Sequence, residues 1–252
     1  MILWVAVRKE LLQGWRTYRW LVTLVVLVAM GMSSPLLARL TPELIRLLPN
    51  GDEIARLIPP PTATDAVAQY IKNMNQFGIL LAVLLAMGAV ADEREKGTAA
   101  MVLSKPMPRS AFLLAKFVAL AGVFAVAFSL AGLACWYYTS VLFAALDPAR
   151  WLALNALLLV LCLVYVATTL LCSTLARSQT AAGGMAIGLL VLVAAVEAIP
   201  TVGRWLPGQL LNWAAALMDG RAVPGLGALG VSLGMIVVSL LAAWAVLERQ
   251  EV

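Results

Sequence analysis

The sequence contains no histidine and few charged residues. Asp, Glu, Lys and Arg make up 12% of the 252 residues, whereas 63% are hydrophobic and the mean hydropathy is +0.94. A soluble domain carries about 25% charged residues, so the composition indicates an integral membrane protein. The lack of histidine excludes Ser-His-Asp hydrolases and sites in which histidine binds zinc or haem iron.

Cysteine is also scarce. Cys135, Cys162 and Cys172 all lie in apolar stretches, and none belongs to a C-x-x-C pair, so disulfides and thiolate metal sites are poorly supported. We expect no catalytic residue, no metal ligand and no cofactor site in this chain. The net charge of +5 does not indicate nucleic acid as a partner, because the basic residues flank apolar stretches, where they face anionic lipid headgroups.

Six uncharged stretches are long enough to cross a bilayer, which takes about 20 residues. They are residues 20–38, 73–91, 117–146, 151–176, 178–196 and 222–247. Most lysines and arginines fall on the side of the termini, and cytoplasmic loops retain such residues. The sequence therefore predicts one all-α integral membrane domain over residues 1–252, multi-pass in the plasma membrane of a prokaryote, with both termini cytoplasmic.

Three further segments lie outside these spans. Residues 1–19 place Trp4 and Trp15 on one helical stripe and basic residues opposite, which favours an amphipathic helix in the membrane interface; the alternative is a flexible basic tail. Residues 39–72 form a polar extracellular insertion. Residues 205–217 are apolar but too short to span, so we expect them to re-enter the membrane or lie at its surface.

Residues 92–116 form a charged segment between the second and third spans, on the predicted cytoplasmic side. Gly97 allows the chain to leave the second span, because glycine adopts backbone angles that other residues avoid. Thr98 can cap a new helix, which Pro106 then ends. The pattern predicts a short helix over residues 98–105 below the membrane, although on composition alone an ordinary charged loop is the alternative.

The motifs in this segment resemble a known family. The order E-R-E-x-G-T at residues 93–98 is similar to the signature of ABC-2 type permeases, the membrane subunits of ATP-driven exporters. The similarity continues at Leu103, Pro106, Arg109 and Lys116. R-K-E-L at residues 8–11 resembles the start of the interfacial helix in those permeases, and S-T-L-A-R-S at residues 173–178 is a weaker similarity.

The resemblance implies that residues 98–105 are a coupling helix that docks on a separate ABC ATPase subunit. It implies a contact with that subunit through Glu93, Arg94, Glu95, Lys96, Gly97, Thr98, Leu103, Lys105, Pro106 and Arg109. Arg8, Lys9 and Glu10 of the interfacial helix would form a second contact. A second permease chain, identical or different, would enclose the transport path with this one.

The resemblance further implies export of a substrate that ATP hydrolysis drives. No G-x-x-x-x-G-K-[ST] motif occurs in the sequence, so Mg-ATP is expected on the partner subunit and this chain is not expected to be an enzyme. One alternative is a secondary transporter, although the spans are almost free of the charged residues that ion coupling uses. Another is a membrane scaffold in an ABC-like signalling, immunity or cofactor-assembly complex.

Glu197 is the one acidic residue next to the core of a span. An acidic residue inside a membrane is by default a functional candidate, which makes Glu197 a possible contact along the transport path. Its place beside Pro200, at the predicted outer end of the fifth span, favours a solvated position at the interface instead.

Overall fold

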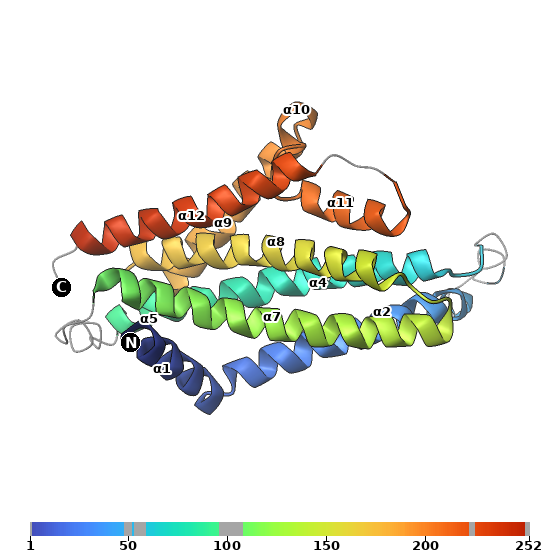
Figure 1. Ribbon diagram of the computed structural model, residues 1–252, viewed down its shortest axis with the longest axis horizontal. Helices are drawn as coiled ribbons and strands as arrows, with labels where there is room; N and C mark the ends of the chain where they lie inside the picture. The colour runs from blue at the N-terminus through green and yellow to red at the C-terminus, as the bar shows by residue number, and fades with distance from the viewer. Residues whose placement is uncertain (1, 48–51, 53–58, 96–107, 222–224, 250–252) are drawn as a thin grey trace.

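The computed structural model describes residues 2–47, 52, 59–95, 108–221 and 225–249. Figure 1 shows long helices that run along one axis, with the two ends of the chain at the same end of the bundle. We call this the terminal end and the opposite one the distal end.

Six helical segments of the described residues are long and apolar enough to cross a membrane. They are α2 (Arg19–Arg46), α4 with α5 (Ala63–Ala86 and Gly88–Glu95), α7 (Arg109–Leu142), α8 (Pro148–Leu175), α9 (Gln179–Glu197) and α12 (Leu226–Arg249). The shorter helices are α1 (Ile2–Arg16), α10 (Pro200–Gly203) and α11 (Gln209–Met218). The prediction of an all-α protein with six spans is confirmed. Helices suit a bilayer because they satisfy their own backbone hydrogen bonds.

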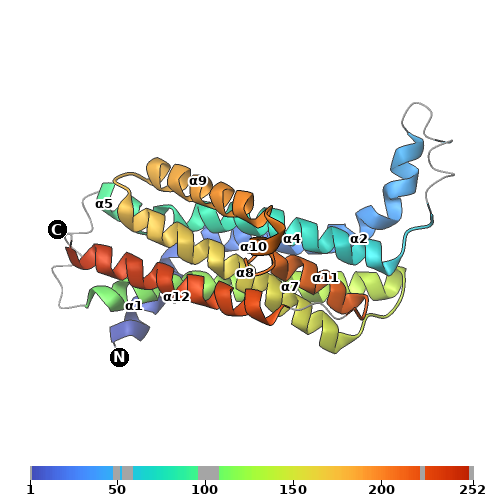
Figure 2. The same cartoon turned by 90° about the horizontal axis from the view of Figure 1, so that it is seen from above.

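The helices extend past the apolar stretches that predicted them. Helix α2 continues through Pro35 and Pro42 to Arg46, so the first part of the predicted 39–72 insertion is helical and continuous with the first span. Each proline removes one backbone hydrogen bond and bends a helix. Figure 2 shows the last turns of α2 leaning away from the bundle at the distal end.

Side-chain caps mark where several spans begin. Thr62 and Asp65 form a capping box before α4. Asp147 and Ser178 each accept a hydrogen bond from a backbone N–H in the first turn of α8 and α9. The first N–H groups of a helix have no partner within the helix, and these caps supply one.

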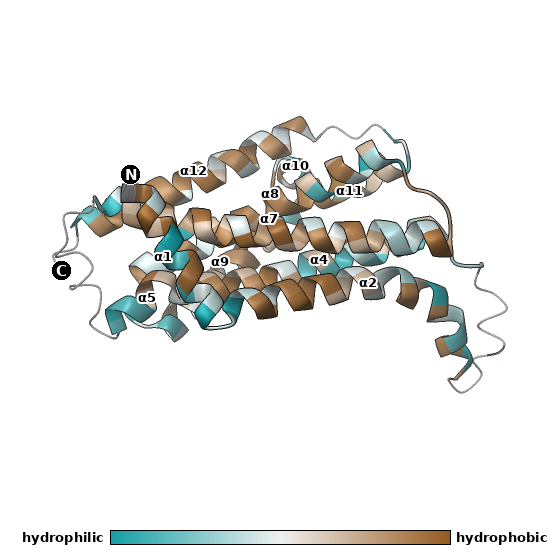
Figure 3. Ribbon diagram, turned by 60° about the horizontal axis from the view of Figure 1, so that its bottom comes forward, coloured by the Kyte–Doolittle hydropathy of each residue, from teal (hydrophilic) through white to brown (hydrophobic). Residues whose placement is uncertain are grey.

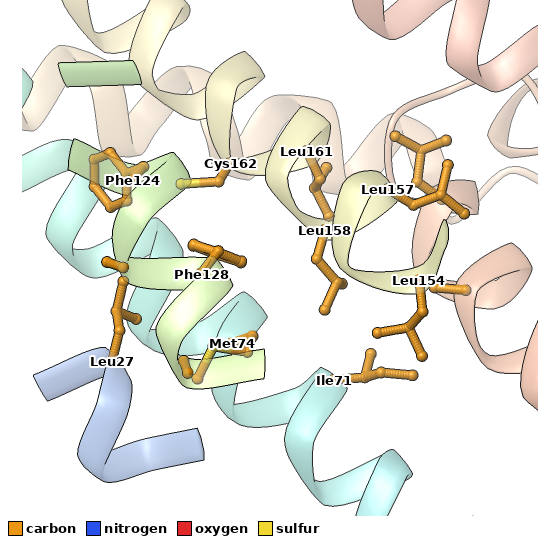
Figure 4. Packing of buried hydrophobic residues seen from close by; sticks show 14 of the residues in the cluster. Leu27, Ile71, Met74, Phe124, Phe128, Leu154, Leu157, Leu158, Leu161 and Cys162 are labelled. Atoms are coloured by element: carbon orange, nitrogen blue, oxygen red, sulfur yellow. The ribbon is translucent and has the colours of Figure 1, made fainter. Parts of the chain in front are cut away.

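The hydrophobic core lies where α2, α4, α7 and α8 meet. Figure 4 shows Phe124 and Phe128 of α7 beside Cys162 of α8, with Met74 of α4 and Leu27 of α2 close by. In its most apolar stretch α8 has 67% of its residues buried, against 17% for α9. Helix α8 is therefore fixed at the centre of the bundle, whereas α9 lies at its edge.

Polar side chains also connect the spans in the distal half. The Asn73 amide of α4 donates to Ser34 Oγ of α2 at 3.0 Å, and the Tyr70 hydroxyl donates to Asn155 Oδ1 of α8 at 2.6 Å. Away from water such groups need partners within the protein, and these bonds fix α2 and α8 against α4.

The short apolar segment before the last span forms α11, which lies along the bundle in Figure 1. Leu210 and Ala214 are fully buried against it. Ten residues of helix measure about 15 Å, half of the ~30 Å hydrocarbon thickness. Helix α11 is therefore too short to span, and its re-entrant or interfacial position stays a prediction.

Figure 3 shows how hydropathy is distributed over the bundle. Hydrophobic residues cover its middle, and hydrophilic residues gather towards both ends, among them α5 and the polar side of α1. A hydrophobic band between polar ends is what a protein that crosses a bilayer requires. The chain is a multi-pass membrane protein.

Candidate functional site

The terminal end of the bundle holds the described residues that the sequence places at a contact with an ATPase subunit. These are Glu93, Arg94 and Glu95 of α5, Arg109 of α7, and Arg8, Lys9 and Glu10 of α1. The other predicted contact residues lie outside the described residues: Lys96, Gly97, Thr98, Leu103, Lys105 and Pro106. The predicted coupling helix, residues 98–105, lies outside them as well.

A buried lysine is the centre of this end. Lys116 of α7 has 3% of its side chain exposed, and its Nζ lies 2.7 Å from Glu93 Oε1 and 3.3 Å from Glu10 Oε1. Lys9 Nζ lies 3.5 Å from Glu10 Oε1 and 3.9 Å from Glu93 Oε1. We call these four residues the Lys116 cluster. Two cations face two carboxylates, so the cluster is neutral and its buried charges are compensated.

The Lys116 cluster joins three helices. Glu10 belongs to α1, Glu93 to α5 and Lys116 to α7. The carboxylates of Glu10 and Glu93 therefore attach α1 and α5 to α7, because the buried ammonium group of Lys116 is unfavourable without a charged partner. The helix predicted to lie in the interface and the stem of the predicted coupling segment are thus attached to the same span.

The next two residues of α5 point elsewhere. Arg94 Nη1 donates to the carbonyl oxygens of Thr174, at 2.9 Å, and Ala176, at 3.4 Å. Glu95 Oε2 accepts from the backbone N–H of Gln179 at 3.2 Å. Successive helical residues are about 100° apart, so Glu93 faces α7 while Arg94 and Glu95 face the turn between α8 and α9.

Ser173 of α8 forms hydrogen bonds with the backbone where α4 ends and α5 begins. We call residues 87–91 the joint between α4 and α5. Its hydroxyl accepts from the backbone N–H groups of Val90 and Ala91, both at 3.0 Å, and donates to the Met87 carbonyl at 2.8 Å. Ser173 is fully buried. The weak S-T-L-A-R-S similarity begins at this residue, and sequence reasoning assigned it no partner.

Arg109 holds the end of the last described helix. Its Nη1 donates to the carbonyl oxygens of Leu247, at 2.6 Å, and Glu248, at 2.8 Å. The last carbonyls of a helix have no partner within it, and a cation there also suits the helix dipole. Arg109 therefore connects the start of α7 to the end of α12.

Helix α1 turns its tryptophans away from the bundle. Trp4 is 72% exposed and Trp15 63% exposed, whereas Val7 is buried. Arg8 and Lys9 are exposed and Glu10 is partly buried. An apolar stripe at the surface, next to exposed basic residues, suits a helix that lies in a membrane interface.

Glu197 lies at the end of α9 and contacts the segment before α11. Its Oε1 accepts from the backbone N–H of Gly208 at 2.7 Å, the residue directly before α11. A Cβ at position 208 would collide with this carboxylate as it lies here, so a larger residue would require the Glu197 side chain to shift. A contact between Glu197 and a substrate stays a prediction.

Two functional candidates were missed or undervalued by sequence reasoning. Lys116 was named only as part of the resemblance. A lysine inside the apolar stretch around Phe112 and Phe117 nevertheless indicates a buried ion pair, because buried lysines are rare unless paired. Ser173 gives no comparable signal. Within the described residues, no group of three or more Cys, Asp or Glu is arranged to hold a metal ion.

Comparison with known proteins agrees with this architecture. A family model described as "ABC-2 family transporter protein" matches residues 4–203, from α1 to α10. The chain is 26% identical over 250 residues to the "Uncharacterized transmembrane protein YxlG" of Bacillus subtilis (strain 168), with 97% of this chain and 96% of that protein covered.

Proposed function

The chain belongs to the ABC-2 family of transporter proteins, and we propose that it is the permease subunit of an exporter whose ATP is hydrolysed on a separate ATPase subunit. The absence of a G-x-x-x-x-G-K-[ST] motif from the sequence supports the assignment of Mg-ATP to that subunit. The substrate would cross the plasma membrane. The terminal end would be cytoplasmic, because most lysines and arginines of the segments between spans lie on that side.

The Lys116 cluster is the observation that carries this proposal. The resemblance implies that α1 and the segment after α5 contact the ATPase subunit, and the cluster binds α1 and α5 to α7. Removing one partner of a buried ion pair leaves an uncompensated charge and costs about 3–5 kcal/mol. A displacement of α1 or α5 by the ATPase subunit would therefore carry α7 with it.

A second permease chain fits the edge of the bundle. Helix α9 has only 17% of its most apolar stretch buried, and a Cβ added at Gly184 or Gly188 would meet no other atom within 4 Å. Glycines four residues apart allow another helix to approach closely in a membrane. We therefore place the contact between two permease chains at α9.

The test is co-purification of the chain with candidate ABC ATPase subunits, followed by ATPase measurement in lipid vesicles. We expect one subunit to co-purify and its hydrolysis to depend on this chain. Glu93→Gln should weaken the coupling of hydrolysis to the permease, and Glu43→Gln, on an exposed part of α2, should not. The proposal is wrong if no ATPase subunit binds or if hydrolysis is the same without the chain.

A further inference from the structure

A side chain of α8 completes the backbone hydrogen bonding at the joint between α4 and α5. An uninterrupted helix would direct the N–H groups of Val90 and Ala91 to carbonyls four residues earlier. Here Ser173 Oγ accepts both N–H groups and donates to the Met87 carbonyl. The backbone at the joint therefore depends on a side chain of α8.

Ser173 has no unused hydrogen-bonding capacity. A hydroxyl offers one donor and two acceptor positions, and the joint occupies all three. Because Ser173 is fully buried, no water can replace it without a change in packing, and an unsatisfied buried N–H is unfavourable. An alanine at this position would leave two amides and one carbonyl of the joint without this partner.

The joint also packs against α9. A Cβ at Gly183 would come within 2.8 Å of Met87 Sδ, and a Cβ at Gly88 within 3.2 Å of the Gln179 side chain. These glycines leave room for the neighbouring side chains. The joint thus lies against both α8 and α9 at the terminal end.

The charged side chains of α5 complete the attachment. Arg94 binds carbonyls at the carboxyl end of α8, and Glu95 binds an N–H at the amino end of α9. A cation at a helix carboxyl end and an anion at a helix amino end both favour the helix dipole. These contacts lie at or directly beside residues 176–178, which we call the α8–α9 turn.

From these contacts we propose that α5 and the α8–α9 turn move as one unit, with Ser173 as the positioning residue that fixes α5 to it and Met87 as the hinge to α4. A displacement of the segment after α5 would reach α9 through this unit. Within one chain α9 is the least buried span, so it would respond together with the last turn of α8, which carries Ser173, whereas the rest of α8 is held by the core. The transmission step rests on the proposed function, since an ATPase subunit supplies the displacement.

The attachment itself is tested on the full chain alone, by hydrogen–deuterium exchange in lipid nanodiscs. We expect Ser173→Ala to speed exchange at Val90 and Ala91 on the order of fivefold, the loss of one or two buried hydrogen bonds. Ser232→Ala is the matched control, because Ser232 is also fully buried but donates only to Ala228 of its own helix. Unchanged exchange in Ser173→Ala would overturn the attachment.

A second variant covers the case in which Ser173→Ala does not fold. Arg94→Gln removes the bonds to the α8–α9 turn and leaves the buried hydroxyl in place. We expect faster exchange in the second half of α5 and at the start of α9, because both sides lose the same contact. Exchange that matches the unmodified chain in both segments would contradict the proposed unit.

Transmission is tested with spin labels at Leu80→Cys on α4 and Met185→Cys on α9, two exposed positions; Met185 lies about 100° around α9 from Gly184, away from the proposed contact with a second chain. The three native cysteines are buried. In the complex with the ATPase subunit, a non-hydrolysable ATP analogue should shift the distance between the labels. The shift should persist in Ser232→Ala and be lost in Ser173→Ala while the ATPase subunit remains bound, which loss of folding would not produce.

The outcomes separate this inference from the proposed function. If the nucleotide shifts the distance equally in Ser173→Ala and in the unmodified chain, transmission through Ser173 is wrong and the proposed function stands. If no ATPase subunit binds, or the unmodified chain does not respond to nucleotide, the proposed function fails and transmission fails with it. The attachment of α5 to the α8–α9 turn is then still decided by hydrogen–deuterium exchange.

Discussion

Lys116 Nζ and Glu93 Oε1 lie 2.7 Å apart, with 3% of the lysine side chain and 13% of the glutamate side chain exposed. The carboxylate of Glu93 is therefore committed to α7 within the chain. The resemblance to ABC-2 permeases implies a contact between Glu93 and an ATPase subunit. In this arrangement its side chain links that region to a span, and a direct contact with an ATPase subunit stays a prediction.

Replacing Lys116 with methionine should strongly destabilise the protein. The variant keeps most of the side-chain volume but leaves Glu10 and Glu93 close together without the cation between them. Breaking a buried ion pair from one side costs about 3–5 kcal/mol, and the exposed Lys9 can compensate only part of it. The measurement is the free energy of unfolding in a lipid-like detergent.

The control for this variant is Lys72→Met, which removes a lysine from an exposed position in the distal half of α4. Adding Glu93→Gln to Lys116→Met should recover part of the lost stability, because it removes one of the two uncompensated carboxylates. If Lys116→Met unfolds at the same denaturant concentration as Lys72→Met, the Lys116 cluster does not stabilise the bundle.

Arg109→Gln should loosen the end of α12. The guanidinium binds the carbonyl oxygens of Leu247 and Glu248, and glutamine is too short to reach both. Hydrogen–deuterium exchange should rise in the last turn of α12 and stay unchanged at its centre. Arg150→Gln is the control, since Arg150 is half exposed and pairs with Asp147, three residues away; equal effects of the two variants would argue against this role.

The spans could be predicted because a bilayer demands long apolar stretches, and the sequence contains six of them. Their ends could not. Pro35 and Pro42 usually end a helix, yet α2 continues through both, because the first span is already helical when it reaches them and a bend is enough.

The partners of the site residues could not be read from the sequence. Lys116 is 106 residues from Glu10 and 23 from Glu93, and only the folded bundle brings the three together. A lysine within an apolar stretch is a signal that a carboxylate lies near it, because buried lysines are rare unless paired, but the signal does not say which carboxylate. Ser173 offered no such signal, because serine in a span commonly bonds to its own helix.

Glu197 variants should distinguish a structural role from a contact with substrate. If the carboxylate serves to hold Gly208, Glu197→Ala should raise hydrogen–deuterium exchange at the start of α11. Glu197→Gln, which keeps an acceptor oxygen, should change it little. Transport should then fall in Glu197→Ala, where α11 is loosened, and be nearly normal in Glu197→Gln.

The opposite pattern would assign Glu197 to the transport path. In that case Glu197→Gln would abolish transport while exchange in α11 remained normal, because the negative charge and not the hydrogen bond would be required. Glu43→Gln provides the matched control, as an exposed glutamate at the distal end of α2. Exchange in α11 and transport, measured on the same variants, thus distinguish a structural role of Glu197 from a contact with substrate.

Ser34→Ala should weaken the attachment of α2 to α4 by about 1–2 kcal/mol, because it leaves the buried Asn73 amide without its acceptor. Ser33→Ala is the matched control, since Ser33 donates only to Met30 of its own helix. Asn73→Leu should remove most of the penalty when combined with Ser34→Ala, because the unsatisfied amide is then absent. A double-mutant cycle of unfolding free energies measures this coupling, and a coupling near zero would show that packing alone holds the two helices together.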